Sequence, residues 1–384
     1  MRVAVVVRTL KIGGMEKVAV SLADAFAESG HESHLIYFKD RNNVFEPNSN
    51  VALHQFDLDK TLHYSGIGLL YEGFARLMNV IVRKSYFVYK GLATASIFKH
   101  RLSQLEKRVG DFDLVIVRGQ GTFEMLWPIQ DTRMVQVCEN VVYSEPLKFS
   151  LHKLYTSLIY RQKNVACVSY VVEESFKKMQ EDYGVDNPKV VTITNPIDSV
   201  ETKVLSEAYQ PEIKGPYIVN VGRIVPIKNI PLLVDAFHYA RVELGLKHKL
   251  VIVGDGSDRK KVEQQVFALG LQDEVHFTGF ISNPYPWMKE ADLYVLSSIS
   301  EGLGMVLLEA IASGTKVVST DCDGVRDVMK GELLRNLAKQ DVHDLAAKMM
   351  SALEDNSIDY KKYLSDFEPK VIVQKYIKNF KGDV

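Results

Sequence analysis

The chain has 384 residues, more than one hydrophobic core usually organises, so two domains are expected. Apolar residues make up 46% and charged residues 25%, values that exclude a disordered or collagen-like chain. The net charge of -1 does not indicate a class of binding partner, and no nucleic-acid partner is expected.

The three cysteines, Cys138, Cys167 and Cys322, lie far apart and form no CxxC pair. Neither a disulfide scaffold nor a zinc site is therefore expected, and a reducing cytosol fits this usage. The apolar run 3–7 ends at Arg8, well short of a signal-peptide core, and is interpreted as a buried strand. No stretch approaches the roughly 20 apolar residues of a spanning helix, so any membrane contact would be peripheral.

The first forty residues predict a strand, a glycine loop, a helix and a second strand, which together make a βαβ unit. Further apolar strands are predicted at 113–117, 134–138, 165–169 and 190–194, before the closing segment Asn195-Pro196-Ile197-Asp198. Short apolar strands that alternate with helices are typical of a parallel sheet covered on both faces. We expect a first, Rossmann-like domain over residues 1–200.

Residues 199–216 are polar, contain two prolines and lack a clear apolar period, so we interpret them as a linker. Strands are then predicted at 217–222, 249–254, 274–279, 292–297 and 316–320, with helices at about 231–243, 258–269 and 305–313. This series predicts a second Rossmann-like domain over 214–365. A last helix at about 370–384 is expected to pack back on the first domain. The fold class is therefore α/β, with two doubly wound domains.

The stretch 73–105 contains no Asp or Glu, but it has six Lys or Arg residues among aromatic and aliphatic ones. This mixture suits an anionic membrane surface, where apolar groups enter the interface and cations meet lipid phosphates. It also suits a pair of solvated helices whose apolar faces pack on the sheet. The sequence leaves both interpretations open.

The most informative segment runs from Ser300 to Ala310. Glu301 lies in a loop and Glu309 about one turn inside the following helix, so both can face a ligand at the helix N-terminus. Gly302 and Gly304 remove side chains where backbone N–H groups must approach that ligand, and such groups favour an anion. A diphosphate joined to sugars meets both demands, because carboxylates accept hydrogen bonds from hydroxyls. The alternative is an ordinary loop before a core helix.

Two cations, Arg223 and Lys228, follow the strand predicted at 217–222, at the edge where open α/β sheets bind ligands. Arg through paired donors and Lys as a point charge can neutralise a pyrophosphate leaving group without magnesium. The alternative is a surface loop with two solvated cations. Gly13 and Gly14 are a weaker signal, because they do not form GxGxxG and a tight turn accounts for both. If the two halves face each other, this loop would close the diphosphate pocket.

Together these segments resemble the family 4 glycosyltransferases of GT-B fold, over almost the whole chain. That family has a GG loop, an NPID-like segment, a GR-x4-K element and an E-x7-E element in this order. The chain matches them with Gly13-Gly14, Asn195 to Asp198, Arg223 with Lys228, and Glu301 with Glu309; Val253 to Gly256 and Phe277 to Phe280 also look like the family. The resemblance implies two Rossmann-like domains that face each other across a cleft, the first binding the acceptor.

The resemblance also implies roles for the matched residues. Arg223 and Lys228 would bind the donor diphosphate, and Glu301 would hold the hydroxyls of the transferred sugar; these three are the expected catalytic residues. Glu309 would hold the ribose, and the other expected donor-binding residues are Gly13, Gly14, Asp255, Phe280, Gly302, Leu303, Gly304 and Met305. Retention of the anomeric configuration is implied, with the leaving phosphate helping to take the acceptor proton. Preorganised positive charge would then supply much of the catalysis.

One departure concerns the acceptor side. Many family members carry a histidine after the strand that corresponds to 134–138, whereas this chain reads Cys138-Glu139-Asn140. Glu139 or Asn140 would take that role, and Arg118 is the third acceptor-side candidate. No metal or cofactor is implied.

The resemblance implies a nucleotide diphosphate sugar as donor, with a UDP-hexose or UDP-N-acetylhexosamine favoured. The acceptor would be a glycan or lipid-linked glycan of bacterial surface polysaccharide or lipopolysaccharide synthesis, handled in the cytoplasm or at the inner face of the plasma membrane. A nucleotide-sugar epimerase or phosphorylase of the same fold, or a non-catalytic binding protein, stays an alternative. A nicotinamide dehydrogenase would need GxGxxG after the first strand, which Gly13-Gly14 does not supply.

Overall fold

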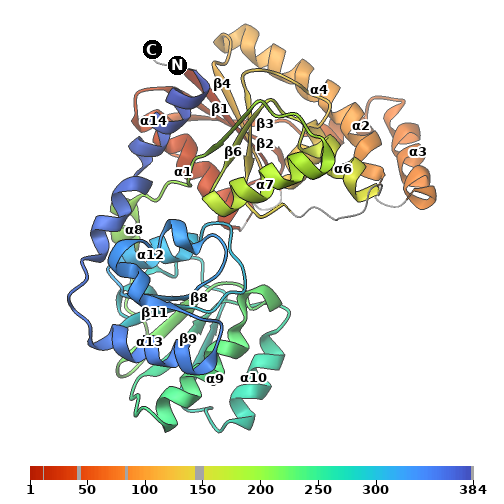
Figure 1. Ribbon diagram of the computed structural model, residues 1–384. Coiled ribbons are helices and arrows are strands. Elements are labelled where there is room, and N and C mark those ends of the chain that lie inside the picture. Colours follow the sequence, from red (N-terminus) through yellow and green to blue (C-terminus); the bar gives the residue numbers. More distant parts are fainter. Residues whose placement is uncertain (12, 41–44, 83–84, 143–150, 382–384) are drawn as a thin grey trace. The chain divides into compact units, whose positions relative to one another are not determined.

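The computed structural model describes residues 1–11, 13–40, 45–82, 85–142 and 151–381. The chain forms two compact units (Figure 1). Unit 1 comprises Met1–Pro196 together with Pro369–Val384, and unit 2 comprises Ile197–Glu368.

Unit 1 is built on a parallel sheet of seven strands in the order β3-β2-β1-β4-β5-β6-β7. The strands are β1 (Arg2–Thr9), β2 (Glu32–Lys39), β3 (Val51–Gln55), β4 (Leu114–Arg118), β5 (Met134–Cys138), β6 (Asn164–Cys167) and β7 (Lys189–Thr192). The central strands are apolar on both faces, and Val3 to Val7 of β1 are fully buried. Such strands require helices on both sides of the sheet.

The helices of unit 1 are α1 (Gly14–Glu28), α2 (Leu58–His63), α3 (Gly68–Ile81), α4 (Tyr86–Val109), α5 (Gln120–Leu126), α6 (Leu151–Ile159), α7 (Tyr170–Tyr183) and α14 (Pro369–Phe380). Capping residues define the ends of α7. Ser169 caps its start by accepting a hydrogen bond from the Val172 N–H, and Gly184 ends the helix with a left-handed backbone. The last helix, α14, packs on α1, where the Tyr376 and Phe26 ring centres lie 6.2 Å apart.

Unit 2 has a parallel sheet of six strands in the order β10-β9-β8-β11-β12-β13. The strands are β8 (Tyr217–Val221), β9 (Lys249–Val253), β10 (Val275–Gly279), β11 (Leu293–Leu296), β12 (Val317–Thr320) and β13 (Leu337–Ala338). The helices are α8 (Ser199–Ser206), α9 (Ile230–Val242), α10 (Arg259–Ala268), α11 (Tyr285–Lys289), α12 (Met305–Ser313) and α13 (Val342–Glu354), with short 3₁₀ turns at Pro226–Lys228, Val325–Asp327, Gly331–Asn336 and Tyr360–Phe367. The predicted fold class, α/β with two doubly wound sheets, is confirmed.

The interpretation of residues 199–216 as a linker is wrong for its first half, which forms α8. Asp198 caps this helix, and α8 packs on α11 and α12 within unit 2. Its buried face carries Thr202 and Ser206, while Val200 and Val204 stay exposed. The helix therefore shows no apolar stripe toward the core, which is why the apolar period was missing.

The basic segment 73–105 falls on two helices of different character. α4 buries Phe98, Leu102 and Leu105, as expected for a helix that packs on the sheet, whereas most large apolar residues of α3 are exposed. Two of its cations, Arg83 and Lys84, lie outside the described residues. Among the helices that the structure describes, none has the length and apolar character to cross a bilayer.

Candidate donor site and acceptor side

The strand order of unit 2 reverses between β8 and β11, and the crevice at such a switch point is where open α/β sheets bind ligands. The loop after β8 contains Arg223 and Lys228, and the loop after β11 contains Glu301. Two bonds join these loops: the Ile299 N–H donates to the Ile227 carbonyl at 2.8 Å, and the Ser297 hydroxyl donates to the Lys228 carbonyl at 2.9 Å. The topology thus brings the two predicted elements together.

Lys228 and Glu301 contact each other directly. The Lys228 Nζ lies 2.6 Å from Glu301 Oε1, and the hydroxyl of the buried Ser298 donates to the same oxygen at 2.5 Å. The two charged side chains are only 18% and 13% exposed. This pair is therefore partly shielded from water, where charge interactions are stronger than at an open surface.

Arg223 is exposed at the end of β8, and among the described residues its guanidinium has no hydrogen bond or ion pair. The backbone beside it is held firmly, because the Ile224 N–H donates to the Asp255 carbonyl at 2.9 Å and the Gly222 N–H to the Val253 carbonyl at 3.0 Å. The loop is fixed while the guanidinium keeps its donors available. Such a group suits paired hydrogen bonds to a phosphate.

Glu309 lies in the second turn of α12, and the hydroxyl of Tyr285 on α11 donates to its Oε1 at 3.0 Å. Tyr294 of β11, the strand that precedes the Glu301 loop, is fully buried. Burial raises the pKa of Tyr294 well above its usual value, and the charges of Glu301 and Glu309 raise it further. The negative charges of both carboxylates therefore act on the same tyrosine of β11.

The loop between Glu301 and α12 presents its backbone as the sequence predicts. Gly304 has φ +77°, a left-handed conformation that favours glycine, and α12 begins at the next residue, Met305. The N–H groups of Gly302, Leu303 and Gly304 have no acceptor among the described residues. Leu303 and Gly304 are buried, and Gly302 is partly exposed. Free N–H groups at a helix start provide an anion site.

Two other predicted donor residues, Asp255 and Phe280, lie on loops after β9 and β10. The Asp255 carboxylate accepts from the Gly256 N–H at 2.7 Å and pairs with Arg259 at 3.3 Å. Phe280 exposes 56% of its surface. The structure gives neither residue a contact with Glu301 or Lys228, and their assignment to the donor stays a prediction.

On unit 1, Gly13 and Gly14 lie between β1 and α1. The Glu16 carboxylate folds back over Gly13 and accepts a hydrogen bond from the Thr9 hydroxyl at 3.2 Å. A Cβ at Gly14 would meet no atom within 4 Å, so the surroundings of unit 1 would tolerate a side chain there. The assignment of this loop to the donor diphosphate stays a prediction.

The three acceptor-side candidates are placed very differently. Arg118, at the end of β4, is fully buried, and its Nη2 contacts Glu139 Oε1 at 2.9 Å and the Asn195 side-chain oxygen at 2.7 Å. Burial raises the pKa of Glu139, although the neighbouring Arg118 opposes this shift. Asn140 is exposed. Arg118 therefore fixes the position of Glu139, and the assignment of all three residues to the acceptor stays a prediction.

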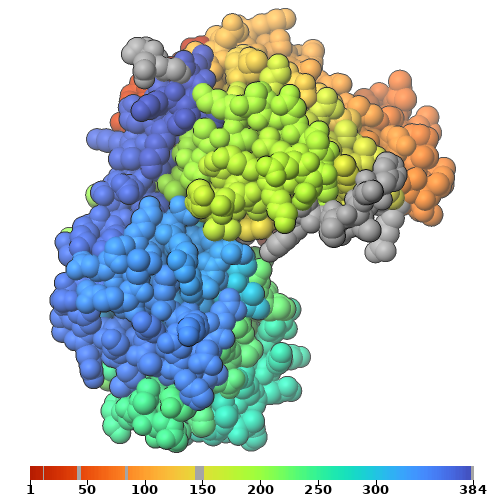
Figure 2. Space-filling view, in the orientation of Figure 1, coloured from red at the N-terminus to blue at the C-terminus, as the bar shows by residue number. Residues whose placement is uncertain are grey.

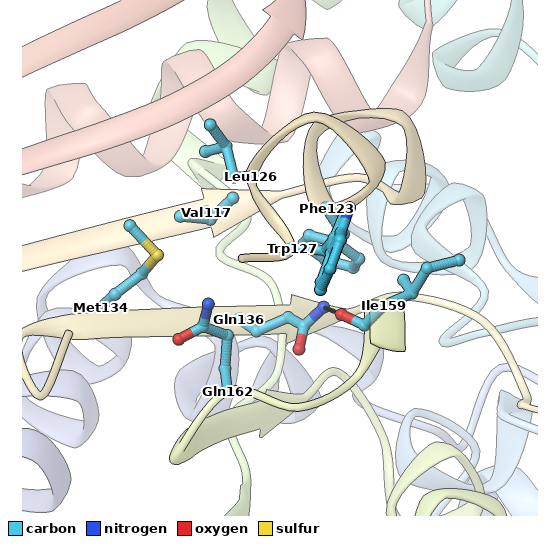
Figure 3. A pocket seen from close by; sticks show the side chains of 8 residues that line it. All are labelled: Val117, Phe123, Leu126, Trp127, Met134, Gln136, Ile159 and Gln162. Carbon is cyan, nitrogen blue, oxygen red and sulfur yellow. Dashed lines mark hydrogen bonds between the residues drawn. The ribbon is translucent and has the colours of Figure 1, made fainter. Parts of the chain in front are cut away.

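A small cavity of about 10 Å³ lies in the core of unit 1 (Figure 3). It is enclosed by Val117, Phe123, Leu126, Trp127, Met134, Gln136, Ile159 and Gln162, and none of these is a predicted site residue. The Gln136 amide donates to the Ile159 carbonyl at 3.0 Å beside it. A space of this size holds about one water, far less than a sugar nucleotide requires. This cavity belongs to core packing.

Sequence reasoning missed the residues that position the predicted ones. Ser298 and Tyr285 hydrogen-bond to Glu301 and Glu309, and Gly324 lets the following loop pack against the backbone of residues 301 and 302. A polar pair directly after an apolar strand was the available signal for Ser298. The contact of Tyr285 depends on how α11 packs on α12, which no local pattern indicates.

Comparisons with known proteins agree with this architecture. The family described as Glycosyltransferase Family 4 matches residues 12–201, and the family described as Glycosyl transferases group 1 matches residues 203–369. The structure resembles that of Anabaena HepE in complex with UDP and glucose, with a TM-score of 0.70, 16% identity and full coverage of both chains.

Two curated relatives match part of the chain. An uncharacterized glycosyltransferase of Methanocaldococcus jannaschii is 29% identical over 42% of this chain and 40% of its own length. The N-acetylgalactosamine-N,N'-diacetylbacillosaminyl-diphospho-undecaprenol 4-alpha-N-acetylgalactosaminyltransferase of Campylobacter jejuni is 27% identical over 54% of this chain and 56% of its own length. The chain thus spans about half the length of these relatives.

Two doubly wound units of parallel strands, and the likeness to the Anabaena structure, define the GT-B class of fold. The two family matches lie end to end and together span nearly the whole sequence. The chain belongs to the family 4 glycosyltransferases.

Proposed function

We infer that the protein transfers a hexose or N-acetylhexosamine from a nucleotide diphosphate sugar to a glycan acceptor, with retention of the anomeric configuration. The observation that carries this proposal is the contact between Lys228 and Glu301 at the switch point of unit 2. One side chain suits the diphosphate and the other suits sugar hydroxyls, so a single ligand that joins both groups satisfies the site.

In the proposed reaction, the bond between the sugar C1 and the β-phosphate oxygen breaks while a bond from C1 to the acceptor oxygen forms on the same face. The acceptor hydroxyl proton passes to the departing phosphate. Arg223 and Lys228 would stabilise the charge that develops on that phosphate, and the N–H groups of residues 302–304 would add to this field. Because the cations are supplied by the chain, the proposal includes no metal ion.

Glu301 and Glu309 would divide the recognition of the donor. Glu301 would bind hydroxyls of the transferred sugar and Glu309 those of the ribose. On donor binding, Lys228 would turn from Glu301 to the diphosphate, and the carboxylate would exchange this cation for sugar hydroxyls. Ser298 supports this exchange because its hydrogen bond keeps Glu301 in position when Lys228 leaves.

A UDP-sugar is the favoured donor, since the Anabaena structure of the same fold contains UDP. A lipid-linked glycan is the favoured acceptor, since the Campylobacter relative is named for a diphospho-undecaprenol substrate. Such an acceptor would bring the enzyme to the inner face of the bacterial plasma membrane, with residues 73–105 as the contacting segment, in surface polysaccharide or lipopolysaccharide synthesis. Glu139, held by Arg118, would lie on the acceptor side.

The test uses purified protein, a panel of UDP- and GDP-sugars, and EDTA in the buffer. Thermal shift selects the donor, since a ligand that binds the folded state raises its stability. The selected donor is then incubated with and without a lipid-linked glycan. Transfer predicts release of the nucleoside diphosphate that depends on the acceptor, and an axial or equatorial C1 linkage that matches the donor in the NMR spectrum of the product.

The alternatives give different products in the same experiment. An epimerase converts the donor without acceptor, a phosphorylase requires inorganic phosphate, and a binding protein gives a thermal shift without turnover. Glu301→Gln and Lys228→Met are expected to abolish transfer, whereas Lys260→Met, an exposed lysine on α10, leaves it unchanged. Full activity in both site variants would contradict the proposed roles.

A further inference from the structure

The outer face of α3 is a continuous row of exposed apolar side chains. Ile67, Leu70 and Val80 expose 75%, 76% and 81% of their surface. We define the α3 face as Ile67, Leu69, Leu70, Phe74, Leu77, Val80 and Ile81, all of which are exposed. Positions 67, 70, 74, 77 and 81 follow the helical repeat, so these side chains form one stripe along the helix.

The opposite face of α3 attaches the helix to α4 through small and polar groups. Gly68 and Ala75 are buried, and the Tyr71 hydroxyl donates to the Tyr89 carbonyl at 2.7 Å. The single acidic residue, Glu72, is paired with Arg76 at 2.9 Å and accepts from the Tyr86 hydroxyl at 3.1 Å. The helix thus turns its polar side inward and its apolar side outward, the reverse of a helix on a soluble domain.

An exposed apolar surface of this extent marks an interaction site in soluble proteins. Figure 1 shows α3 at the outer margin of unit 1, beside α2, and Figure 2 shows the same residues at the margin of that unit. α3 packs on α2 and α4, and the Phe74 ring lies 5.3 Å from that of Tyr89 on α4. The other members of the stripe keep more than half of their surface exposed among the described residues: Ile67, Leu70, Leu77 and Ile81.

The charged residues around the α3 face are mostly positive, which favours an anionic partner. Between residues 60 and 105 the only carboxylate is Glu72, which Arg76 already neutralises. The exposed side chains of Lys60 and Arg101, on the helices that hold α3, form no ion pair with a carboxylate among the described residues. A second copy of the chain would bring the same uncompensated cations together across a two-fold contact. An anionic surface with an apolar interior satisfies both features.

We propose that the α3 face inserts into the interface of an anionic lipid bilayer, with α3 lying in the membrane plane. Its leucine, isoleucine, valine and phenylalanine side chains enter the boundary between headgroups and acyl chains, and the neighbouring cations meet lipid phosphates. The contact proposed for residues 73–105 thereby moves to residues 67–81, because the apolar groups of α4 are used in the core. This inference rests on the proposed function in one respect: membrane binding would give the enzyme access to a lipid-linked acceptor.

The test is co-sedimentation of the whole protein with vesicles of phosphatidylcholine alone or mixed with phosphatidylglycerol. Leu70→Gln/Leu77→Gln removes two members of the α3 face, and Val242→Gln/Phe267→Gln is the matched control, because both of these residues are exposed apolar groups of unit 2. We expect binding to the mixed vesicles, a loss of about tenfold in affinity for each α3 leucine, and no change in the control.

Three outcomes would overturn the inference. The first is equal vesicle binding by the α3 variant and the wild type. The second is absence of vesicle binding by the wild type. The third is a wild-type dimer in light scattering that the α3 variant converts to a monomer, which would assign the face to a second copy. All four exchanged residues are exposed, so each variant should keep the wild-type circular dichroism spectrum. Thermal shift with UDP, measured on the same samples, separates failure of this inference from failure of the donor site.

Discussion

Replacement of Gly324 by alanine tests whether the loop after β12 sets the position of Glu301. The backbone of Gly324 has φ +83°, and a Cβ there would lie 2.3 Å from the Glu301 carbonyl oxygen and 2.5 Å from that of Gly302. The left-handed backbone alone costs alanine about 1 kcal/mol. Relief of the overlap requires the two loops to separate by about 1 Å, which adds about 1–3 kcal/mol of overpacking.

Gly314→Ala is the matched control, because Gly314 has φ +94° and a Cβ there would meet no atom within 4 Å. Urea unfolding should show a loss of about 1 kcal/mol for the control and about 2–4 kcal/mol for Gly324→Ala. Since a displacement of about 1 Å at a reacting group can cost about 100-fold in rate, transfer should fall by that factor in Gly324→Ala only. Equal activity of the two variants would refute this role of the loop.

Three further predictions follow from other contacts. Tyr285→Phe removes the hydrogen bond to Glu309 and should weaken nucleotide binding in calorimetry by less than Glu309→Gln, which should lose about tenfold; a larger loss in Tyr285→Phe would contradict the ribose role of Glu309. Arg118→Met leaves the partly buried Glu139 without its cation and should cost about 3 kcal/mol in urea unfolding at pH 8. A carboxyl whose pKa is raised in the folded state binds more protons there, so its destabilising effect grows as pH rises through that pKa; the loss should therefore be smaller at pH 5, and a larger loss at pH 5 would contradict this reasoning. All three cysteines are buried, and burial together with Glu301 raises the pKa of Cys322 to about 12, so a thiol reagent at pH 8 should modify none before unfolding and all three afterwards.

The sequence predicted most of the sheet because buried parallel strands are short, fully apolar runs. It missed β3, whose Ala52 and Gln55 are exposed, and the two-residue strand β13, which has too few positions to show a pattern. It also missed α8, whose buried face is polar. In each case tertiary contacts, which a local pattern does not contain, decide the structure.

The candidate site shows the same division. The loops with Arg223, Lys228 and Glu301 could be predicted because charged residues directly follow strands that meet at the switch point. The direct contact of Lys228 with Glu301, and the burial of Arg118 beneath Glu139, depend on side-chain packing across the sheet. The different roles of the two helices in the basic segment could be told apart only in the structure, because α3 is the more apolar helix and yet the more exposed one.

Hydrogen–deuterium exchange with a bound nucleotide tests the central claim most directly. The protein is labelled in EDTA, with and without whichever of UDP, GDP or ADP gives the largest thermal shift. The donor site described for unit 2 predicts protection in residues 222–229 and 297–309, and loss of that protection in Lys228→Met. Tight nucleotide binding that protects other segments and leaves both of these unchanged would contradict it.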